Sequence, residues 1–385
     1  MASPLPIPDN EALAHSRRLV ELICSEIEAA GGWIDFARYM HLALYTPGLG
    51  YYSGGTSKFG ASGDFVTAPE ISSLFGQTLA RQAAQVLQQT KGDLLELGAG
   101  TGALCVQLLP ALQELGILPQ HYFILEVSAQ LREVQRRTLQ QALSPELLSL
   151  VIWLDTLPET FNGLVLANEV LDALPVHIVQ TSDKGLQQLG VGCKDGELTW
   201  STQELAAGKL HDKAAALNLP PDYRTEICPA MDGLIASLGD MLQQGVLLFI
   251  DYGFPRHEYY HAHRNEGTLM CHYRHYAHGD PFLYPGLQDI SAHVDFTAAA
   301  EAGVSNGLPL LGYCSQAQFL INCGITELLQ QKMSQDMTVY TRVASEAQKL
   351  LSPAEMGELF KVLALGKGDA DALCGFSQGD KRHRL

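Results

Sequence analysis

The fold is decided by the stretch Leu94-Leu95-Glu96-Leu97-Gly98-Ala99-Gly100-Thr101-Gly102. Its apolar residues predict a buried strand, its three glycines a tight turn, and the apolar spacing that follows from residue 103 a helix. Glycines let the backbone pass close to a ligand, and the amides at the start of a helix donate hydrogen bonds to it. Strand, turn and helix together predict a site for a nucleotide-like cofactor.

Glu96 helps to separate two kinds of cofactor. A dinucleotide would place its pyrophosphate on the amides of the turn, whereas a carboxylate two residues before the first glycine suits the positively charged amino acid end of S-adenosylmethionine. Gly98, Gly100 and Ala103 also satisfy the loose dinucleotide pattern in which alanine replaces the last glycine. The stretch alone favours S-adenosylmethionine and leaves a nicotinamide dinucleotide and a plain tight turn open.

Outward from the turn, strand and helix patterns alternate. Strands are expected at residues 93–97, 122–126, 150–154, 163–167 and 246–251, and helices at 103–116, 129–142 and 231–243. This order predicts an α/β, Rossmann-like fold with a doubly wound, mostly parallel sheet. We expect residues 1–75 to form an N-terminal helical and loop extension, and residues 76–385 the main domain, with insertions at about 173–230 and 252–295.

The composition excludes several classes of protein. With 385 residues, of which 46% are hydrophobic, the chain can bury a large core, so disorder is not expected. Its formal charge of −17 disfavours a nucleic acid partner and fits a positively charged substrate, although solubility alone explains it equally well. Eight cysteines without a CxxC pair predict reduced thiols, and no apolar stretch reaches the length of a membrane span, so we expect a cytoplasmic protein.

Acidic residues stand at the ends of two of the predicted strands, at the edge where open α/β sheets bind ligands. Glu126, 24 residues after Gly102, is expected to meet the ribose hydroxyls of an adenosine cofactor. Asp155 is expected near the adenine. For each residue the alternative is a solvated acid at a strand end.

A further polar group, Asn168, Glu169 and Asp172, follows the fourth predicted strand. Methyl transfer from a sulfonium is an in-line displacement, so the protein's main tasks are positioning and control of charge. Glu169 and Asp172 are three residues apart and can fork an arginine guanidinium so that one nitrogen points at the methyl group. Capping of local helix ends is the alternative for Asn168 and Asp172.

Histidines gather in the second half of the chain. His293 stands in the polar cluster 288–296, where it could position the substrate or take a proton, or equally be a buried histidine bonded to Asp289 or Asp295. Six of the thirteen histidines lie within residues 257–278, but their spacing shows no clear set of four zinc ligands, so no metal is predicted. Their aromatic and basic neighbours instead predict a contact loop at the substrate-facing rim.

Seven stretches, spread over about residues 30–366, carry a family resemblance: Tyr45-Thr46-Pro47-Gly48-Leu49-Gly50-Tyr51-Tyr52, Gly63-Asp64-Phe65-Val66-Thr67-Ala68-Pro69-Glu70-Ile71-Ser72, Glu96 to Gly102, Asn168 to Val176, Asp251-Tyr252-Gly253-Phe254, Gln288 to Phe296, and Phe360-Lys361-Val362-Leu363. Together they resemble the MidA family of class I S-adenosylmethionine-dependent methyltransferases, which includes mitochondrial assembly-factor methyltransferases of respiratory complex I. The first, second and sixth stretches are the most specific.

The resemblance implies a seven-stranded sheet whose last strand is antiparallel, S-adenosyl-L-methionine as cofactor, and methylation of a protein arginine, on a complex I subunit in the mitochondrial members. We expect residues 63–72 to fold over the cofactor; a structural loop against the N-terminal helices is the alternative. The expected cofactor-binding residues are Glu96, Gly98, Gly100, Thr101, Gly102, Glu126, Asp155, Asn168, Thr67, Pro69 and Glu70, and the expected catalytic residues are Glu169, Asp172 and His293.

The first residues of the chain lack an Arg-rich and Ser-rich leader, which predicts a bacterial rather than a mitochondrial protein. Two other functions stay open at this point. One is a protein that binds S-adenosylmethionine and acts as an assembly scaffold without turnover, and the other is a nicotinamide-dinucleotide oxidoreductase. The expected partner is a protein substrate, and a homodimer is left open.

Overall fold

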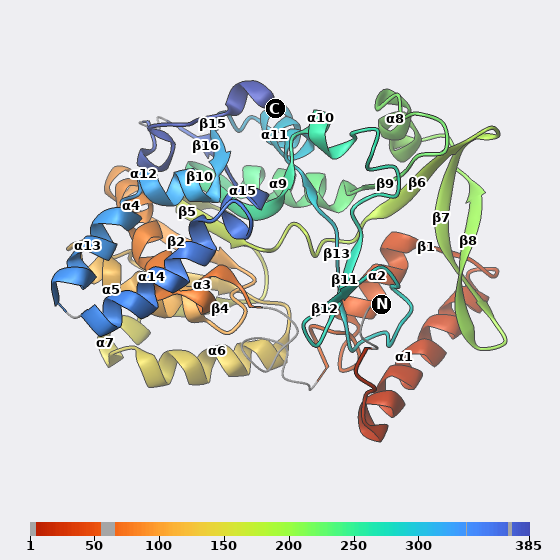
Figure 1. The fold of residues 1–385 in the computed structure, drawn as a ribbon, viewed down its shortest axis with the longest axis horizontal. Coiled ribbons are helices and arrows are strands. Elements are labelled where there is room, and N and C mark those ends of the chain that lie inside the picture. Colours follow the sequence, from red (N-terminus) through yellow and green to blue (C-terminus); the bar gives the residue numbers. More distant parts are fainter. Residues whose placement is uncertain (1–4, 55–65, 336, 369–371) are drawn as a thin grey trace. The chain divides into compact units, whose positions relative to one another are not determined.

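The computed structural model describes residues 5–54, 66–335, 337–368 and 372–385, and the chain divides into two compact units. The first, which we call the sheet unit, consists of residues 66–171, 232–256 and 294–385. The second, which we call the insertion unit, consists of residues 1–65, 172–231 and 257–293. The segments predicted as insertions of the main domain therefore group with the N-terminal residues. Figure 1 labels the helices and strands of both units.

The sheet unit contains an eight-stranded sheet in the order β15-β16-β10-β5-β2-β3-β4, with β14 beside β10. The strands are β2 (Asp93–Leu97), β3 (Tyr122–Leu125), β4 (Val151–Leu154), β5 (Phe161–Asn168), β10 (Leu242–Phe254), β14 (Val294–Asp295), β15 (Leu310–Ser315) and β16 (Phe360–Lys367). Strands β4, β3, β2, β5 and β10 are parallel, whereas β16, the last strand of the chain, is antiparallel to both neighbours. The predicted α/β fold and antiparallel last strand are confirmed, and β14 is a short additional strand.

The helices of the sheet unit lie before, between and after its strands along the chain and flank the sheet (Figure 1). They are α3 (Ala68–Ile71), α4 (Ser73–Thr90), α5 (Ala103–Glu114), α6 (Ala129–Ala142), α7 (Pro145–Leu148), α11 (Phe296–Ser305), α12 (Gln316–Asn322), α13 (Ile325–Gln335), α14 (Met337–Leu351) and α15 (Met356–Leu359). Two helices cross a unit boundary: α9 (Pro229–Met241) and α10 (Arg256–Tyr259). Short turns of 3-10 helix at Cys374–Phe376 and Arg382–Arg384 end the chain.

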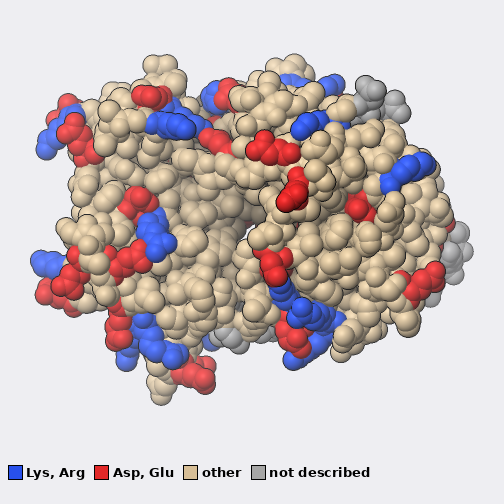
Figure 2. Space-filling model, turned by 180° about the vertical axis from the view of Figure 1, so that it is seen from behind, with Lys and Arg blue, Asp and Glu red and all other residues tan. Residues whose placement is uncertain are grey.

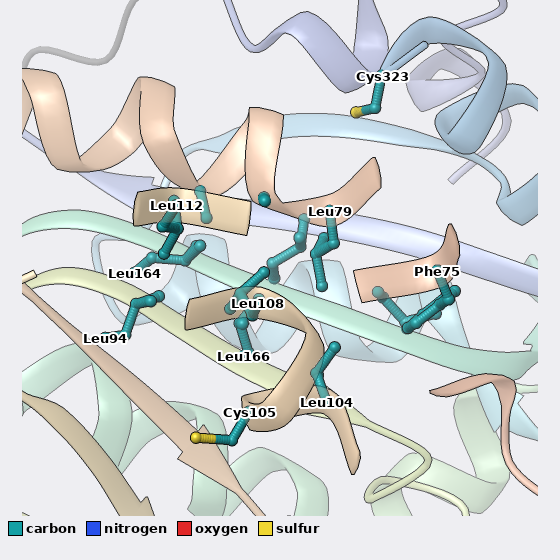
Figure 3. Packing of buried hydrophobic residues seen from close by; sticks show 14 of the residues in the cluster. Phe75, Leu79, Leu94, Leu104, Cys105, Leu108, Leu112, Leu164, Leu166 and Cys323 are labelled. Atoms are coloured by element: carbon teal, nitrogen blue, oxygen red, sulfur yellow. The ribbon is translucent and has the colours of Figure 1, made fainter. Parts of the chain in front are cut away.

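The main hydrophobic core lies between one face of this sheet and helices α4 and α5 (Figure 3). Successive strand residues point to opposite faces, so Leu94 on β2 and Leu164 and Leu166 on β5 all lie on this face. They pack against Leu79 on α4 and Leu108 on α5 and are almost completely buried. The buried apolar runs of β2 and β5 therefore hold the strand that precedes the glycine turn in a rigid setting.

The insertion unit has two sheets of its own. The larger has the order β1-β7-β6-β9, with β8 beside β7, and the smaller has the order β12-β11-β13. Its strands are β1 (Ile34–Asp35), β6 (His177–Ser182), β7 (Gly185–Lys194), β8 (Glu197–Glu204), β9 (Arg224–Ile227), β11 (Met270–Tyr273), β12 (Tyr276–His278) and β13 (Asp289–Ser291). Its helices are α1 (Asn10–Ala29), α2 (Phe36–Tyr45) and α8 (Lys209–Ala216).

Helix α1 begins where Asp9 accepts a hydrogen bond from the amide of Ala12, as an N-cap residue does. A disulfide joins Cys24 on this helix to Cys193 on β7. The prediction that the cysteines are all reduced is therefore wrong for this pair. The two residues are 169 positions apart and meet only because α1 packs along β7, which cysteine spacing cannot reveal.

Among the described residues, no helix combines the length and the apolar character that a membrane crossing requires. Figure 2 shows one face of the molecule, on which red acidic side chains are interspersed with blue basic ones. Since opposite charges alternate there over short distances, no single-sign patch dominates that face.

Candidate functional site

The glycine turn joins β2 to α5 in the sheet unit. Gly98, Gly100 and Gly102 have φ values of 61°, 53° and 86°, in the left-handed region that favours glycine. A Cβ on Gly102 would lie 2.5 Å from the side chain of Leu139 of α6, which would have to shift to make room. Gly98 is exposed, and α5 begins directly after Gly102. The turn therefore presents open backbone and the first amides of a helix, as a cofactor cradle requires.

Glu96 is only 4% exposed, and its Oε2 accepts a hydrogen bond from the hydroxyl of Tyr122 at 2.7 Å. It lies on the face of β2 that α5 covers, near Cys105, whose thiol pKa is raised by burial and also by the charge of Glu96. Burial raises the pKa of Glu96 to about 7, against the lowering effect of the Tyr122 hydroxyl. Its carboxylate is therefore enclosed beside the turn and is poised to change its charge near neutral pH.

Glu126 follows β3 and is also 4% exposed. Its two oxygens accept hydrogen bonds from the amide of Ser128 at 2.9 Å and from the side-chain amide of Gln135 at 3.0 Å. The same Gln135 nitrogen donates to the carbonyl of Gly100 at 3.0 Å, so it joins the acid to the glycine turn. Burial raises the pKa of Glu126, although these donors favour its charged form.

Gln135 was not predicted from the sequence, because a glutamine in the middle of an amphipathic helix carries no local signal. Its Oε1 is fixed by the indole N–H of Trp153 at 2.9 Å. Arg132, one turn earlier on α6, donates to the carbonyl of Glu126 and to the carboxylate of Asp155 at 2.6 Å. Asp155 directly follows β4, and its side chain is 89% exposed. Arg132 connects its carboxylate to the backbone carbonyl of Glu126.

Residues 67–71 lie beside the glycine turn. Thr67 and Glu70 form a capping box at the start of α3. Glu70 accepts a hydrogen bond from the hydroxyl of Thr101 at 3.1 Å, and the carbonyl of Pro69 accepts one from Gln107 on α5. The structure thus brings three predicted cofactor residues to the turn. Residues 63–65 of the same predicted stretch lie outside the described part of the chain.

Glu169 directly follows β5 and has a φ of 55°, a left-handed conformation that is uncommon for a residue other than glycine. Its backbone amide donates to the carbonyl of Ile250 on β10, and its Oε1 accepts from the amide of Ala68 at 3.3 Å and from Asn168 at 3.1 Å. Strained backbone of this kind gathers at functional sites. The Oδ1 of Asn168 is buried and has no hydrogen-bond partner among the described residues, so it is available as an acceptor.

Asp251, in the last part of β10, fixes the segment after Glu169. It is completely buried, and its Oδ2 accepts hydrogen bonds from the amides of Val170 at 3.1 Å and Leu171 at 2.9 Å. Its Oδ1 accepts from the amide of Tyr252. In the sequence Asp251 stands out only as part of a family motif, and its role in shaping the neighbouring strand end becomes visible in the structure.

Asp172 and His293 belong to the insertion unit. Asp172 is 7% exposed, and its carbonyl accepts a hydrogen bond from the amide of Ala292 at 3.1 Å. The next amide, that of His293, donates to the hydroxyl of Thr268 at 3.1 Å. Asp289 accepts a hydrogen bond from the hydroxyl of Tyr52 at 2.8 Å. The structure therefore brings the backbones of Asp172 and His293 together inside one unit.

The histidine-rich loop separates into a short helical start, at α10, and strands β11 and β12. Within the described ranges, no group of three or more histidine, cysteine, aspartate or glutamate side chains is arranged to hold a metal ion. The loop's predicted place at a substrate-facing rim stays a prediction.

Comparisons with known proteins identify the cofactor class. A family model described as "Putative S-adenosyl-L-methionine-dependent methyltransferase" matches residues 78–314, more than half of the chain. The mitochondrial protein arginine methyltransferase NDUFAF7 of Danio rerio is 27% identical over 383 residues, covering 91% of this chain and 87% of the relative. That of Mus musculus is 29% identical over 402 residues, covering 94% and 86%.

A solved structure is more similar still. A Burkholderia thailandensis protein bound to S-adenosylhomocysteine is 49% identical, with a TM-score of 0.96, and the match covers 99% of this chain and 100% of that chain. These findings decide the choice of cofactor in favour of S-adenosylmethionine. The residues of the site fit it, because the glycine turn offers exposed backbone at Gly98 and Asn168 offers a buried acceptor.

Proposed function

The chain belongs to this family of S-adenosylmethionine-dependent methyltransferases, and from that premise we propose that it methylates an arginine nitrogen of a protein. The observation that carries the proposal is Glu169, a carboxylate held in a left-handed conformation where β5 ends, on the strand next to that of the glycine turn. The curated relatives named as protein arginine methyltransferases support the same acceptor.

The chemistry that the cofactor supplies is an electrophilic methyl group on a sulfonium. In the displacement a nitrogen–carbon bond forms, the carbon–sulfur bond breaks and the acceptor nitrogen loses a proton. A guanidinium needs its delocalised charge held on one side while the attacking nitrogen is aligned, and a carboxylate does this with two parallel hydrogen bonds. The amide of Ala68 and the side chain of Asn168 orient the carboxylate of Glu169 for this task.

The roles of the other residues are proposed in the same sense. Glu96, Glu126, Asn168 and the amides of the turn would hold the cofactor, with Gln135 keeping Glu126 in place. Asp172 is the weaker second ligand of the guanidinium, and His293 positions the substrate or takes the proton. The identity of the protein substrate, a respiratory complex I subunit or its homologue, and the cytoplasmic location stay predictions.

Incubation of the enzyme with labelled S-adenosylmethionine and lysate from its own deletion strain tests the proposal. The labelled residue is then mapped by mass spectrometry, and we expect it to be arginine. Glu169→Gln should lose most of the transfer while binding S-adenosylhomocysteine as the wild type does. Glu159→Gln, an exposed acid in the same unit, is the matched control and should transfer normally.

Two outcomes would contradict the proposal. Label on lysine, on a nucleic acid or on a small metabolite would exclude the arginine acceptor while leaving the family and the cofactor untouched. If Glu169→Gln transferred no methyl group yet restored every phenotype of the deletion strain, a binding or scaffold function without turnover would be the better explanation.

A further inference from the structure

We propose that Glu226 and Thr268 are positioning residues that fix the backbone on which Asp172 and His293 are presented. The inference rests on the proposed function, because it concerns two residues assigned to the substrate there. All four residues belong to the insertion unit. Glu226 and Thr268 are 42 positions apart in the chain and were not singled out by the sequence.

Glu226 lies on β9 and is 3% exposed. A buried carboxylate is costly unless donors surround it, and here three groups of one short segment do so. Its Oε2 accepts from the amide of Thr268 at 2.9 Å and from the Thr268 hydroxyl at 3.0 Å, and its Oε1 accepts from the amide of Leu269 at 3.2 Å. The hydroxyl of Tyr259 contributes a longer bond of 3.4 Å. The carboxylate therefore ties the segment before β11 to β9.

The close approach is built into the backbone of this segment. Gly267 has a φ of 82°, and a Cβ placed there would lie 2.1 Å from Oε1 of Glu226. A side chain there would displace the carboxylate and strain the backbone, so glycine lets the segment approach Glu226 in this arrangement.

The hydroxyl of Thr268 connects the Glu226 carboxylate to the backbone of His293. A hydroxyl has one hydrogen and two acceptor lone pairs. The hydrogen goes to Glu226, which leaves the oxygen to accept from the amide of His293 at 3.1 Å. The hydroxyl of Tyr259 lies 3.2 Å from the same oxygen and within 3.4 Å of Glu226, so it shares its one hydrogen between them. Thr268 is 7% exposed, so water competes little for these bonds. The carboxylate thereby determines that the Thr268 hydroxyl donates to Glu226 and accepts from His293.

Two consecutive amides after β13 thus have fixed acceptors. The amide of Ala292 donates to the carbonyl of Asp172, and the amide of His293 donates to Thr268. Loss of the Thr268 hydroxyl would release one of the two bonds and let His293 move relative to Asp172. Such a movement would slow methyl transfer, because the reacting atoms of an in-line displacement must be aligned.

A pair of substitutions tests the inference. Thr268→Val keeps the shape and removes the hydroxyl, whereas Thr268→Ser keeps the hydroxyl. We expect Thr268→Val to transfer methyl groups to proteins of the deletion-strain lysate about tenfold more slowly, as the loss of one well-placed bond does, and Thr268→Ser to stay within about twofold of the wild type. Calorimetric affinity for S-adenosylhomocysteine should be unchanged in both variants.

Hydrogen exchange at the His293 amide provides a readout that does not depend on which residue receives the methyl group. Exchange there should become faster in Thr268→Val and stay slow in Thr268→Ser. Transfer by Thr268→Val at the wild-type rate, or equal losses in both variants, would overturn the inference, and so would a loss of cofactor affinity that matches the loss of transfer. Label on a residue other than arginine in the wild type would contradict the proposed function alone. If Thr268→Val fails to fold, Glu226→Gln serves as the second variant with the same expected exchange at His293.

Discussion

Replacement of the buried acid beside the glycine turn, Glu96→Gln, should change how the stability of the protein depends on pH. Burial raises the pKa of Glu96 from 4.5 to about 7 in the folded state. Below pH 4.5 the carboxyl is protonated in both the folded and the unfolded state, so it costs nothing. Between pH 4.5 and 7 the unfolded state releases the proton and the folded state keeps it. The free energy of unfolding of the wild type therefore falls as the pH rises through this window.

The size of the effect follows from the two pKa values. A folded-state pKa of about 7 against 4.5 in the unfolded state corresponds to about 3 kcal/mol, which is fully lost above pH 7. Glutamine does not titrate, and its oxygen can still accept the hydrogen bond from Tyr122. The free energy of unfolding of Glu96→Gln relative to the wild type should therefore increase by about 3 kcal/mol between pH 4.5 and pH 8.

Urea denaturation followed by circular dichroism at pH 5, 6, 7 and 8 measures this difference, and other titrating groups cancel because both proteins contain them. Tyr122→Phe is a second test, because it removes the donor that lowers the pKa of Glu96 and should shift the window to higher pH. A difference between Glu96→Gln and the wild type that stays constant from pH 5 to pH 8 would refute the reasoning.

Three further outcomes are expected. Glu126→Ala should weaken S-adenosylhomocysteine binding by about tenfold or more in calorimetry, since a buried acceptor fixed by two donors is lost; unchanged affinity would exclude Glu126 from the cofactor site. Asp251→Asn should lower the free energy of unfolding, measured in urea, by about 2 kcal/mol, because the side-chain NH2 group of asparagine would face backbone N–H donors. A variant as stable as the wild type would count against the role described for Asp251. Reduction of the Cys24–Cys193 disulfide should lower the free energy of unfolding by about 2–4 kcal/mol without changing cofactor affinity, and Cys193→Ser should have the same effect. Equal stability of the oxidised and reduced protein would disprove this expectation.

Much of the sheet could be predicted because its strands are short apolar runs with clear ends. The expected strands 93–97 and 122–126 correspond to β2 and β3, and the expected strand 246–251 lies within β10. The grouping of residues 172–231 and 257–293 with the N-terminal helices could not be predicted in this way. It depends on which surfaces pack against each other, and hydrophobic periodicity along the chain does not record that.

The residues of the site also fall into those that the sequence could predict and those that it could not. Spacing from the glycine turn was enough to point to Glu126, because strand length and helix length fix where the next strand ends. The roles of Gln135, Asp251 and Thr268 could not be predicted, since each acts through a hydrogen bond to a residue on another element. Polar residues inside a helix, at a strand end or in a loop are common, and only the partner distinguishes them.

At Glu169 the backbone favours glycine, whereas the proposed chemistry requires a carboxylate. A non-glycine residue in the left-handed region costs about 1 kcal/mol, and glycine at this position would avoid the cost. The buried carboxylate of Asp251 offsets it, because two charge-assisted hydrogen bonds to the following amides stabilise the turn that the strain produces. A chain under selection for stability alone would keep neither the strained glutamate nor the buried aspartate. Glu169 after β5 and Asp251 on the neighbouring strand β10 together support the proposal that the carboxylate of Glu169 binds a cationic acceptor.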